Sequence, residues 1–297
     1  MAPSVRLAKG VQQLDLYLGL RTNVRMNRLI RPLIAFTIAL ASCPAKAGAQ
    51  DSVPQQWLLE RVTEKDAIVA TASFDNGLTI VARCDHDVFD LLIVGLPEAS
   101  ASEVHRSLAL LVGEQTREKA YFWTVASDRT AAFSRVPGVL ARQLARGGTL
   151  QIILPAPAGG RRTRYVMGLE PSGEAVNETL THCGWPVFDP RDELLLGDGL
   201  GPPGNIMWKT LPQAQFPGQA AQNGITDGSV TLNCILAADG KLDACRIESE
   251  HPRGYGFGRE ALRSVGQARM RLTDTAQAEG VTMTQAPIVF AITYRVQ

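Results

Sequence analysis

The C-terminal stretch Gly228–Val296 constrains the fold of this chain most strongly, because it combines a hairpin signal with two cysteines. Apolar residues alternate with polar or smaller ones over Val230–Leu236, which is the period of a half-buried strand. Asp239-Gly240 then predicts a tight turn, since glycine tolerates the positive φ that such a turn requires. A two-residue turn would place Cys234 directly opposite Cys245, and a three-residue turn would shift the pairing by one residue. Either register leaves the two thiols close together.

The remainder of this stretch predicts a helix and a final strand. After the glycine loop Gly254–Gly258, apolar residues recur at helical spacing within Arg259–Leu272. The run Pro287–Val296 alternates again, with its proline at the strand start, where a missing N–H does least harm. The glycine loop lacks the spacing of a phosphate-binding loop, so we interpret it as a connection. We therefore expect a ββαβ unit in which one helix covers a small antiparallel sheet.

A longer series of motifs, in a fixed order, carries a family resemblance. The motifs are Phe216-Pro217-x-x-Ala220, Gly228-x-Val230-x-Leu232-x-Cys234, Asp239-Gly240-x-Leu242-x-x-Cys245-x-Ile247, Glu250-x-Pro252, Gly256-Phe-Gly258, Ala261-Leu262, Arg269-Met270 and Pro287-Ile-Val-Phe290. Over residues 208–297 this pattern resembles the C-terminal domain of the TonB family, in particular its cysteine-bearing form. The resemblance implies a protein-binding module that adds an extended peptide, such as a segment of an outer-membrane receptor, to an open sheet edge. It implies that the last strand is this edge, with backbone contacts at Val289, Ala291, Thr293 and Arg295.

Residues 1–49 predict a signal region for export. The apolar run Leu33–Ala41 follows two arginines and is too short to span a bilayer as a helix. Ala47–Ala49 is typical of a cleavage site. Residues 1–25 fit no export pattern, which gives the hypothesis that translation starts at Met26.

A second interpretation of the signal region concerns Cys43. Leu40–Cys43 resembles a lipobox, in which the cysteine is lipidated and acyl chains attach the protein to a membrane without a spanning helix. In the alternative, Cys43 is discarded with the signal. In both cases we expect the protein in the periplasm or cell envelope of a Gram-negative bacterium.

Export permits disulfide bonds, and four cysteines follow the signal. Three connectivities exist for four cysteines, and we favour Cys84–Cys183 and Cys234–Cys245, one in each domain. Alternatively, Cys84-x-His86 and His182-Cys183 could converge on a metal ion. Because the protein is exported, we favour the disulfide and predict no metal.

The fold class we expect is α+β. Residues 51–185 predict a β-rich module with two short helices, Pro137–Arg146 and Ser172–Cys183. Residues 186–207 contain many turn and breaker signals and predict a linker to the ββαβ domain of residues 208–297. Asp189 and Asp192 fall in this linker, where we expect solvent to surround them.

The formal net charge of +1 argues against nucleic acid as the main partner. No recognisable nucleophile or cofactor motif is present in the sequence, so we expect a non-enzymatic protein without a cofactor; a hydrolytic envelope enzyme is a third hypothesis that no motif supports. The basic cluster Arg161-Arg162-x-Arg164 is interpreted as a solvated hairpin loop.

Two functions from different classes follow. The first is strand addition of a partner peptide, with a link to energy-dependent outer-membrane transport. This link depends on whether residues 1–49 are retained as an anchor, because TonB energy transducers have an uncleaved N-terminal helix and a longer spacer than this chain. The alternative is an envelope structural or assembly lipoprotein that oligomerises through the same fold, since sheet edges also pair with one another.

Overall fold

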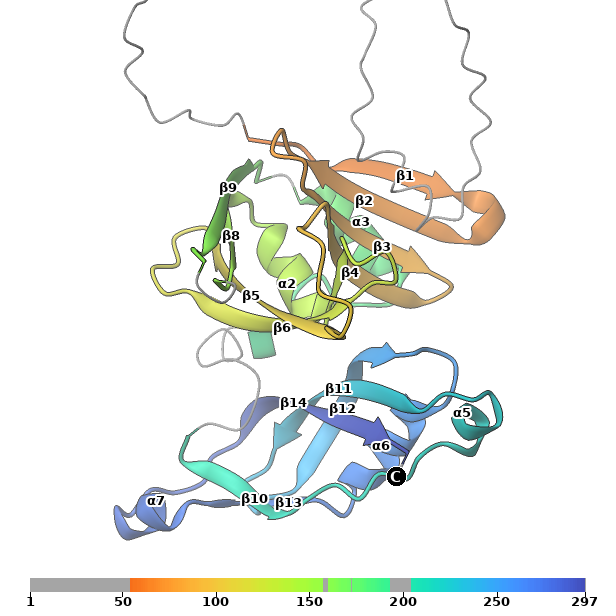
Figure 1. Cartoon of the computed structure of the whole chain (residues 1–297). Coiled ribbons are helices and arrows are strands. Elements are labelled where there is room, and N and C mark those ends of the chain that lie inside the picture. Colours follow the sequence, from red (N-terminus) through yellow and green to blue (C-terminus); the bar gives the residue numbers. More distant parts are fainter. Residues whose placement is uncertain (1–53, 157–159, 172, 193–203, 297) are drawn as a thin grey trace, which may run out of the picture. The chain divides into compact units, whose positions relative to one another are not determined.

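The N-terminal module of the computed structural model is a single antiparallel sheet that curls around a buried helix (Figure 1). Its strands are β1 (Leu58–Val62), β2 (Ala67–Ser73), β3 (Thr79–Asp85), β4 (Val88–Val94), β5 (His105–Val112), β6 (Lys119–Val125), β7 (Ala132–Ser134), β8 (Gly148–Leu154) and β9 (Thr163–Leu169). Their order in the sheet is β1-β2-β3-β4-β7-β6-β5-β8-β9. A 3-10 turn, η1 (Thr63–Lys65), connects β1 to β2.

The structure describes residues 54–156, 160–171, 173–192 and 204–296. The predicted signal region 1–49, with Met26 and Cys43, therefore lies outside the described residues, as do Ser172 and residues 193–203. Among the described helices, none combines the length and apolar character needed to cross a bilayer.

The two ends of the curled sheet meet through the segment before β1. The Gln55 N–H donates to the Gly168 carbonyl at 2.9 Å, and the Glu170 N–H donates to the Gln55 carbonyl at 3.0 Å. These two bonds form a parallel bridge beside β9. The sheet consequently surrounds its core on most sides.

Two helices complete this module, as the sequence predicts. Helix α2 (Pro137–Leu144) is buried at every position and begins with its proline in the first turn, where no N–H is needed. Helix α3 (Glu174–His182) packs on β2 and β3. A disulfide with a Cα–Cα distance of 5.5 Å joins Cys84 of β3 to Cys183, directly after α3.

The C-terminal module has its own hydrophobic core. Its elements are β10 (Ile206–Thr210), α5 (Gly218–Gln222), β11 (Asp227–Leu236), β12 (Leu242–His251), α6 (Phe257–Val265), β13 (Arg269–Leu272), α7 (Asp274–Ala278) and β14 (Ala286–Arg295). A three-stranded antiparallel sheet has the order β12-β11-β14, and β10 pairs with β13. The α+β class and the ββαβ order of β11, β12, α6 and β14 are confirmed.

The helix predicted over Arg259–Leu272 is wrong in its second half. Helix α6 ends at Val265, with Gly266 as its C-cap. Residues Arg269–Leu272 alternate between charged and apolar side chains and form β13 instead, because strand β10 offers them a pairing partner that the local sequence does not reveal.

The β11–β12 hairpin combines the two registers that the sequence left open. The Ala237 N–H donates to the Lys241 carbonyl at 2.9 Å, which is the three-residue turn. An irregularity follows between Asn233 and Ile235, opposite Ala244, which has a φ of 46°. This bulge restores the other register, so that Cys234 and Cys245 face each other and form the second favoured disulfide, with a Cα–Cα distance of 4.0 Å.

From Pro54 onward the described residues form one compact unit, although it contains two hydrophobic cores. The division into domains 51–185 and 208–297, with a linker over 186–207, therefore stays a prediction.

Candidate functional site

Strand β14 lies at the edge of the C-terminal sheet. It pairs with β11 from Asp227↔Arg295 to Leu236↔Ala286 without a register shift. On its other side, no strand of the described chain pairs with it. The strand therefore presents a row of main-chain groups without a ladder partner, which is the usual template for adding another strand.

The hydrogen-bond pattern of the ladder decides which residues present those groups. The Val296 N–H donates to the Thr226 carbonyl at 2.9 Å, so this pair is of the hydrogen-bonded kind. Because the two kinds of pair alternate along an antiparallel ladder, the N–H and C=O groups of the predicted contact residues point away from β11. These residues are Val289, Ala291, Thr293 and Arg295.

The side chains of these four residues lie in two different environments. Val289 is 1% exposed and belongs to the hydrophobic cluster of the N-terminal module, whereas Ala291, Thr293 and Arg295 are exposed. The four residues therefore do not form one uniformly open edge. The accessible part of β14 is the segment from residue 291 to 295.

Aromatic packing fixes the end of β14 on its apolar face. The ring of Phe257 lies 4.9 Å from that of Tyr294 and 5.4 Å from that of Phe216, measured between centroids. Gly228 makes room for Phe257, since a Cβ there would come within 2.6 Å of the ring. The Tyr294 hydroxyl donates to the Phe257 carbonyl at 2.9 Å, and burial raises the pKa of this tyrosine.

The opposite face of the same sheet is polar and is covered by the N-terminal module. Thr231 and Asn233 of β11 are fully buried there. Arg135, which follows β7, donates from Nε to the Thr231 hydroxyl at 3.3 Å, and the Ser249 hydroxyl donates to the Arg135 carbonyl at 3.0 Å. Polar contacts thus connect the two modules across this face.

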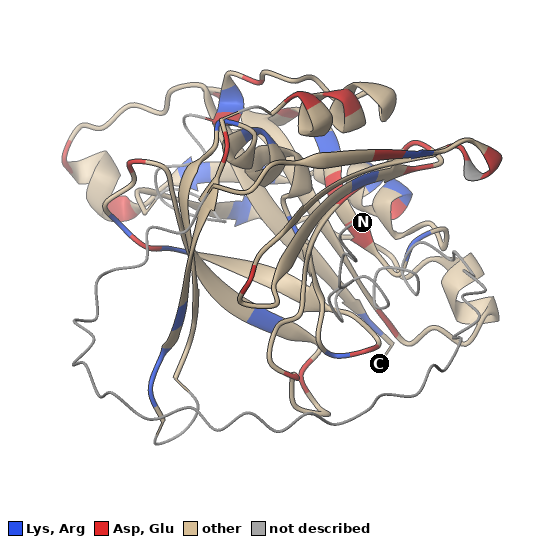
Figure 2. Ribbon diagram, turned by 90° about the horizontal axis from the view of Figure 1, so that it is seen from above, with Lys and Arg blue, Asp and Glu red and all other residues tan. Residues whose placement is uncertain are grey.

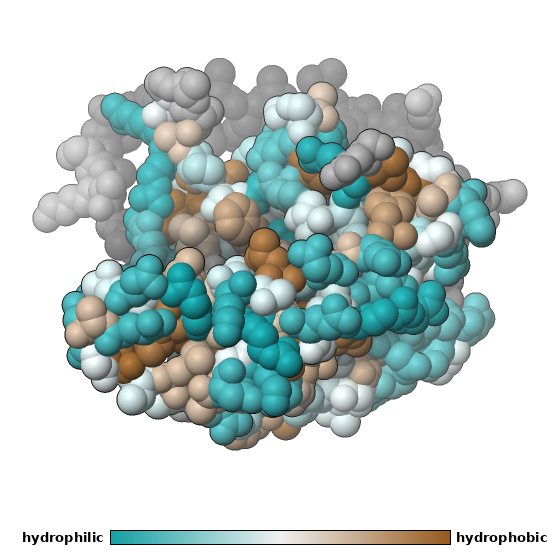
Figure 3. All heavy atoms as spheres, turned by 90° about the horizontal axis from the view of Figure 1, so that it is seen from below, coloured by the Kyte–Doolittle hydropathy of each residue, from teal (hydrophilic) through white to brown (hydrophobic). Residues whose placement is uncertain are grey.

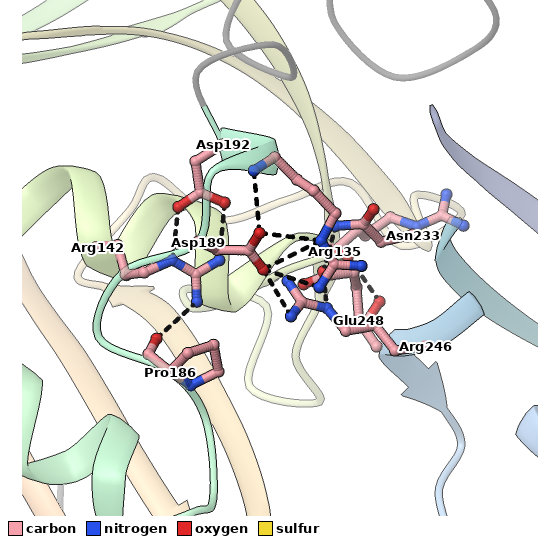
Figure 4. Close-up of polar contacts among 10 residues, drawn as sticks. Arg135, Arg142, Pro186, Asp189, Asp192, Asn233, Arg246 and Glu248 are labelled. Carbon is pink, nitrogen blue, oxygen red and sulfur yellow. Dashed lines mark hydrogen bonds and ion pairs between the residues drawn. The ribbon is translucent and has the colours of Figure 1, made fainter. Parts of the chain in front are cut away.

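The expectation that solvent surrounds Asp189 and Asp192 is wrong. Their exposed fractions are 5% and 3%, and both lie in a buried ion-pair group (Figure 4). Arg142 of α2 donates to both carboxylate oxygens of Asp192, at 2.5 and 2.8 Å. A buried carboxylate is stable only when paired, and two of the arginines that pair these acids, Arg142 and Arg246, are distant in sequence.

Asp189 connects the segment after α3 to strand β12. Its carboxylate accepts from Arg191 at 2.8 Å and forms an ion pair with Arg246 of β12 at 2.8 Å. Burial opposes ionisation of Asp189, but the hydrogen bonds from Arg191 and the charge of Arg246 outweigh it and hold the pKa well below its ordinary value. Arg246 also donates to Glu248 at 3.0 Å.

A second ion-pair group joins the modules at Asp90 of β4. Arg83 of β3 donates to this carboxylate at 2.9 Å, and Arg253, just beyond β12, donates to it at 3.0 Å. Strand β12 is therefore held at two places by acids of the preceding module, whereas the 291–295 segment of β14 stays exposed.

The cysteine and histidine motif does not form a metal site. Both cysteines are in the disulfide, His86 contacts Asp85 at 2.6 Å, and His182 contacts Asp66 at 3.4 Å. The described residues contain no group of three metal-ligating side chains.

The surface charges are mixed. In the basic hairpin loop, Arg162 and Arg164 both pair with Glu118. Figure 2 shows basic and acidic residues interspersed over many strands and helices rather than gathered on one element. The face in Figure 3 is largely hydrophilic, with hydrophobic residues in small groups.

The C-terminal module is thus a disulfide-bonded ββαβ unit whose last strand has no second ladder partner among the described residues. Residues 212–292 match the family model described as Gram-negative bacterial TonB protein C-terminal. Among solved structures, the chain is similar to the solution NMR structure of the TonB C-terminal domain from Pseudomonas aeruginosa. The two are 17% identical, the match covers 33% of this chain and 94% of that chain, and the TM-score is 0.28.

The comparison with curated proteins found no significant match to the chain. The family resemblance predicted from the sequence is confirmed for residues 212–292.

Proposed function

We propose that the C-terminal module binds an extended peptide segment of a partner protein by strand addition to β14, within the envelope of a Gram-negative bacterium. The observation that carries this proposal is the outward orientation of the main-chain groups at Ala291, Thr293 and Arg295 on an unpaired, exposed edge. In strand addition, main-chain hydrogen bonds supply affinity and alternate side chains supply specificity.

The covered half of β14 limits the length of the added strand. The Val289 side chain is buried against the N-terminal module. A peptide that runs along β14 from residue 295 therefore meets that module between residues 291 and 289. We infer that the N-terminal module positions the sheet and restricts the peptide to the 291–295 segment.

The family match and the predicted export support an outer-membrane receptor segment as the partner. The protein itself then acts as a non-enzymatic binding component linked to outer-membrane transport. The competing function, self-association for envelope assembly, uses the same edge, because an open strand also pairs with a second copy of itself.

A proline at residue 293 tests strand addition. The Thr293 N–H points away from β11, so Thr293→Pro removes a donor from the free edge without removing a ladder bond. We expect binding of extended peptides from outer-membrane receptors to the full mature chain to weaken at least tenfold, measured by fluorescence anisotropy. Thr282→Pro, in an exposed segment before β14, is the matched control and should leave the affinity unchanged.

Equal affinity of the wild type and Thr293→Pro would contradict strand addition at β14. Light scattering separates the two functions: a monomer that binds peptide supports recognition, whereas a dimer that Thr293→Pro dissociates supports assembly.

A further inference from the structure

A cavity of about 370 Å³ lies between the two modules, at the end of β14. One wall of the cavity consists of cross-strand rows of side chains on the polar face of the C-terminal sheet. One row is His251, Ser229 and Thr293, which are direct cross-strand neighbours, and the next contains Asp227 and Arg295. The N-terminal module contributes Val104, His105 and Arg135. The cavity is therefore continuous with the proposed peptide-binding edge.

Arg135 is the exceptional group in this cavity. It is 8% exposed, its Nε is bonded to Thr231, and its Nη2 is buried without a hydrogen-bond partner. No carboxylate of the described residues lies within hydrogen-bond distance of its guanidinium. A buried guanidinium without a counter-charge is costly, and a carboxylate is its natural two-pronged partner.

The other charged groups around the cavity do not supply this partner. Asp227 and Arg295 are adjacent and of opposite charge. Burial, followed by the charge of Arg135, lowers the pKa of His105, and burial, followed by Arg253, lowers the pKa of His251. Both imidazoles are then neutral near pH 7, so Arg135 remains as the cation that lacks an acid.

We propose that this cavity binds a carboxylate, and that the carboxylate is an acidic side chain of the strand added to β14. This inference rests on the proposed function and specifies its partner. A peptide residue opposite Thr293 has its side chain on the same face of the sheet as Ser229 and Thr231. Two strand spacings, about 10 Å, separate that residue from β11, which favours glutamate over the shorter aspartate.

The site can be tested without any peptide. Thermal unfolding of the full mature chain is compared in sodium acetate and in sodium chloride, at equal pH and ionic strength. Because a ligand that binds the folded state raises its stability, acetate should raise the Tm of the wild type relative to chloride. The rise should be absent in Arg135→Gln and retained in Arg253→Gln, which removes an interface arginine outside the cavity. The same acetate effect in wild type and Arg135→Gln, or none in the wild type, would overturn the site.

Arg135→Lys is the second variant, for the case that Arg135→Gln does not fold. It keeps the charge but loses the planar fork, so it should reduce the acetate effect. An undiminished effect in Arg135→Lys would count against a two-pronged carboxylate site.

The acidic side chain is tested with capped pentapeptides Val-Thr-X-Thr-Val, in which X is Glu, Asp or Gln. A charge-assisted hydrogen bond predicts that the Glu peptide binds about tenfold more tightly than the Gln peptide, with Asp between them. In Arg135→Gln the preference should disappear while the affinity for the Gln peptide stays the same. An equal preference in both proteins would overturn the assignment. If no peptide binds, strand addition fails, and the acetate experiment still decides the carboxylate site.

Discussion

The side chains of the central strand β11 are buried on both faces of the C-terminal sheet, but by different chemistry. One face packs apolar side chains of β11 and β14 on α6, with Leu232 and Phe257 fully buried. On the other face, Thr231 accepts a hydrogen bond from Arg135 of the N-terminal module, and the buried Asn233 and Glu248 bond to each other beside the Arg246–Asp189 ion pair. Apolar burial holds the sheet together at any pH, whereas ion pairs depend on the charges of both partners. We infer that burial on the apolar face stabilises the fold of the C-terminal module. The polar contacts on the other face hold the sheet in its position against the N-terminal module.

The largest effect is expected on the apolar face. Phe257→Ala empties the position at which Phe216, Tyr294 and Gly228 meet. Loss of a buried phenylalanine costs about 3–5 kcal/mol. Urea unfolding should report this loss, and a cost below about 1 kcal/mol would show that the α6 face does not control the fold.

Two single proline variants in β14, one at a ladder-bonded position and one at the free edge, should differ in their free energy of unfolding. Ile292 pairs with Val230 by ladder bonds, so Ile292→Pro removes a bond inside the sheet and should cost about 2–3 kcal/mol. Thr293→Pro should cost less than about 1 kcal/mol, because its N–H is on the free edge. Equal costs in urea unfolding would contradict the assigned orientation of the strand.

On the polar face, Asp189→Asn should weaken the contacts between the two modules without unfolding the C-terminal sheet. The change leaves Arg191 and Arg246 without their carboxylate, and since both arginines are partly exposed we expect a loss of about 2 kcal/mol rather than the full cost of a broken buried pair. Proteolysis should attack the 186–207 segment faster, while amide exchange in β11 stays slow. Loss of protection in β11 would mean that the polar face also makes the fold.

The smallest effect concerns acid. The pKa of Asp189 is lower in the folded protein than its ordinary value, so its contribution to stability is present above about pH 4 and is lost as the pH falls below that value. The wild type should therefore lose more stability than Asp189→Asn between pH 5 and 3. Parallel pH profiles of the two proteins would contradict this contribution.

Local signals predicted the parts of the fold that local residues determine. The alternation before Asp239-Gly240, the even number of cysteines and the proline of α2 led to the hairpin, the two disulfides and the central helix. Strand β2 was not predicted, because it is buried on both faces and lacks a clear period of two.

Long-range pairing was not predictable in the same way. Strand β13 depends on β10, far away in sequence, and the burial of Asp189 depends on Arg246. The site follows the same rule. The family resemblance implied the contact residues of β14, but nothing in the strand itself indicates that the N-terminal module covers Val289 or that Arg135 and Thr293 line the same cavity.

The central claim is tested most directly by amide hydrogen exchange in β14, measured by NMR with and without a bound peptide. The N–H groups of Ala291, Thr293 and Arg295 should exchange quickly in the free protein and become protected when the peptide is added, whereas those of Ile292 and Tyr294 should be protected in both states. A peptide that binds and leaves the exchange of Ala291, Thr293 and Arg295 unchanged would contradict the account.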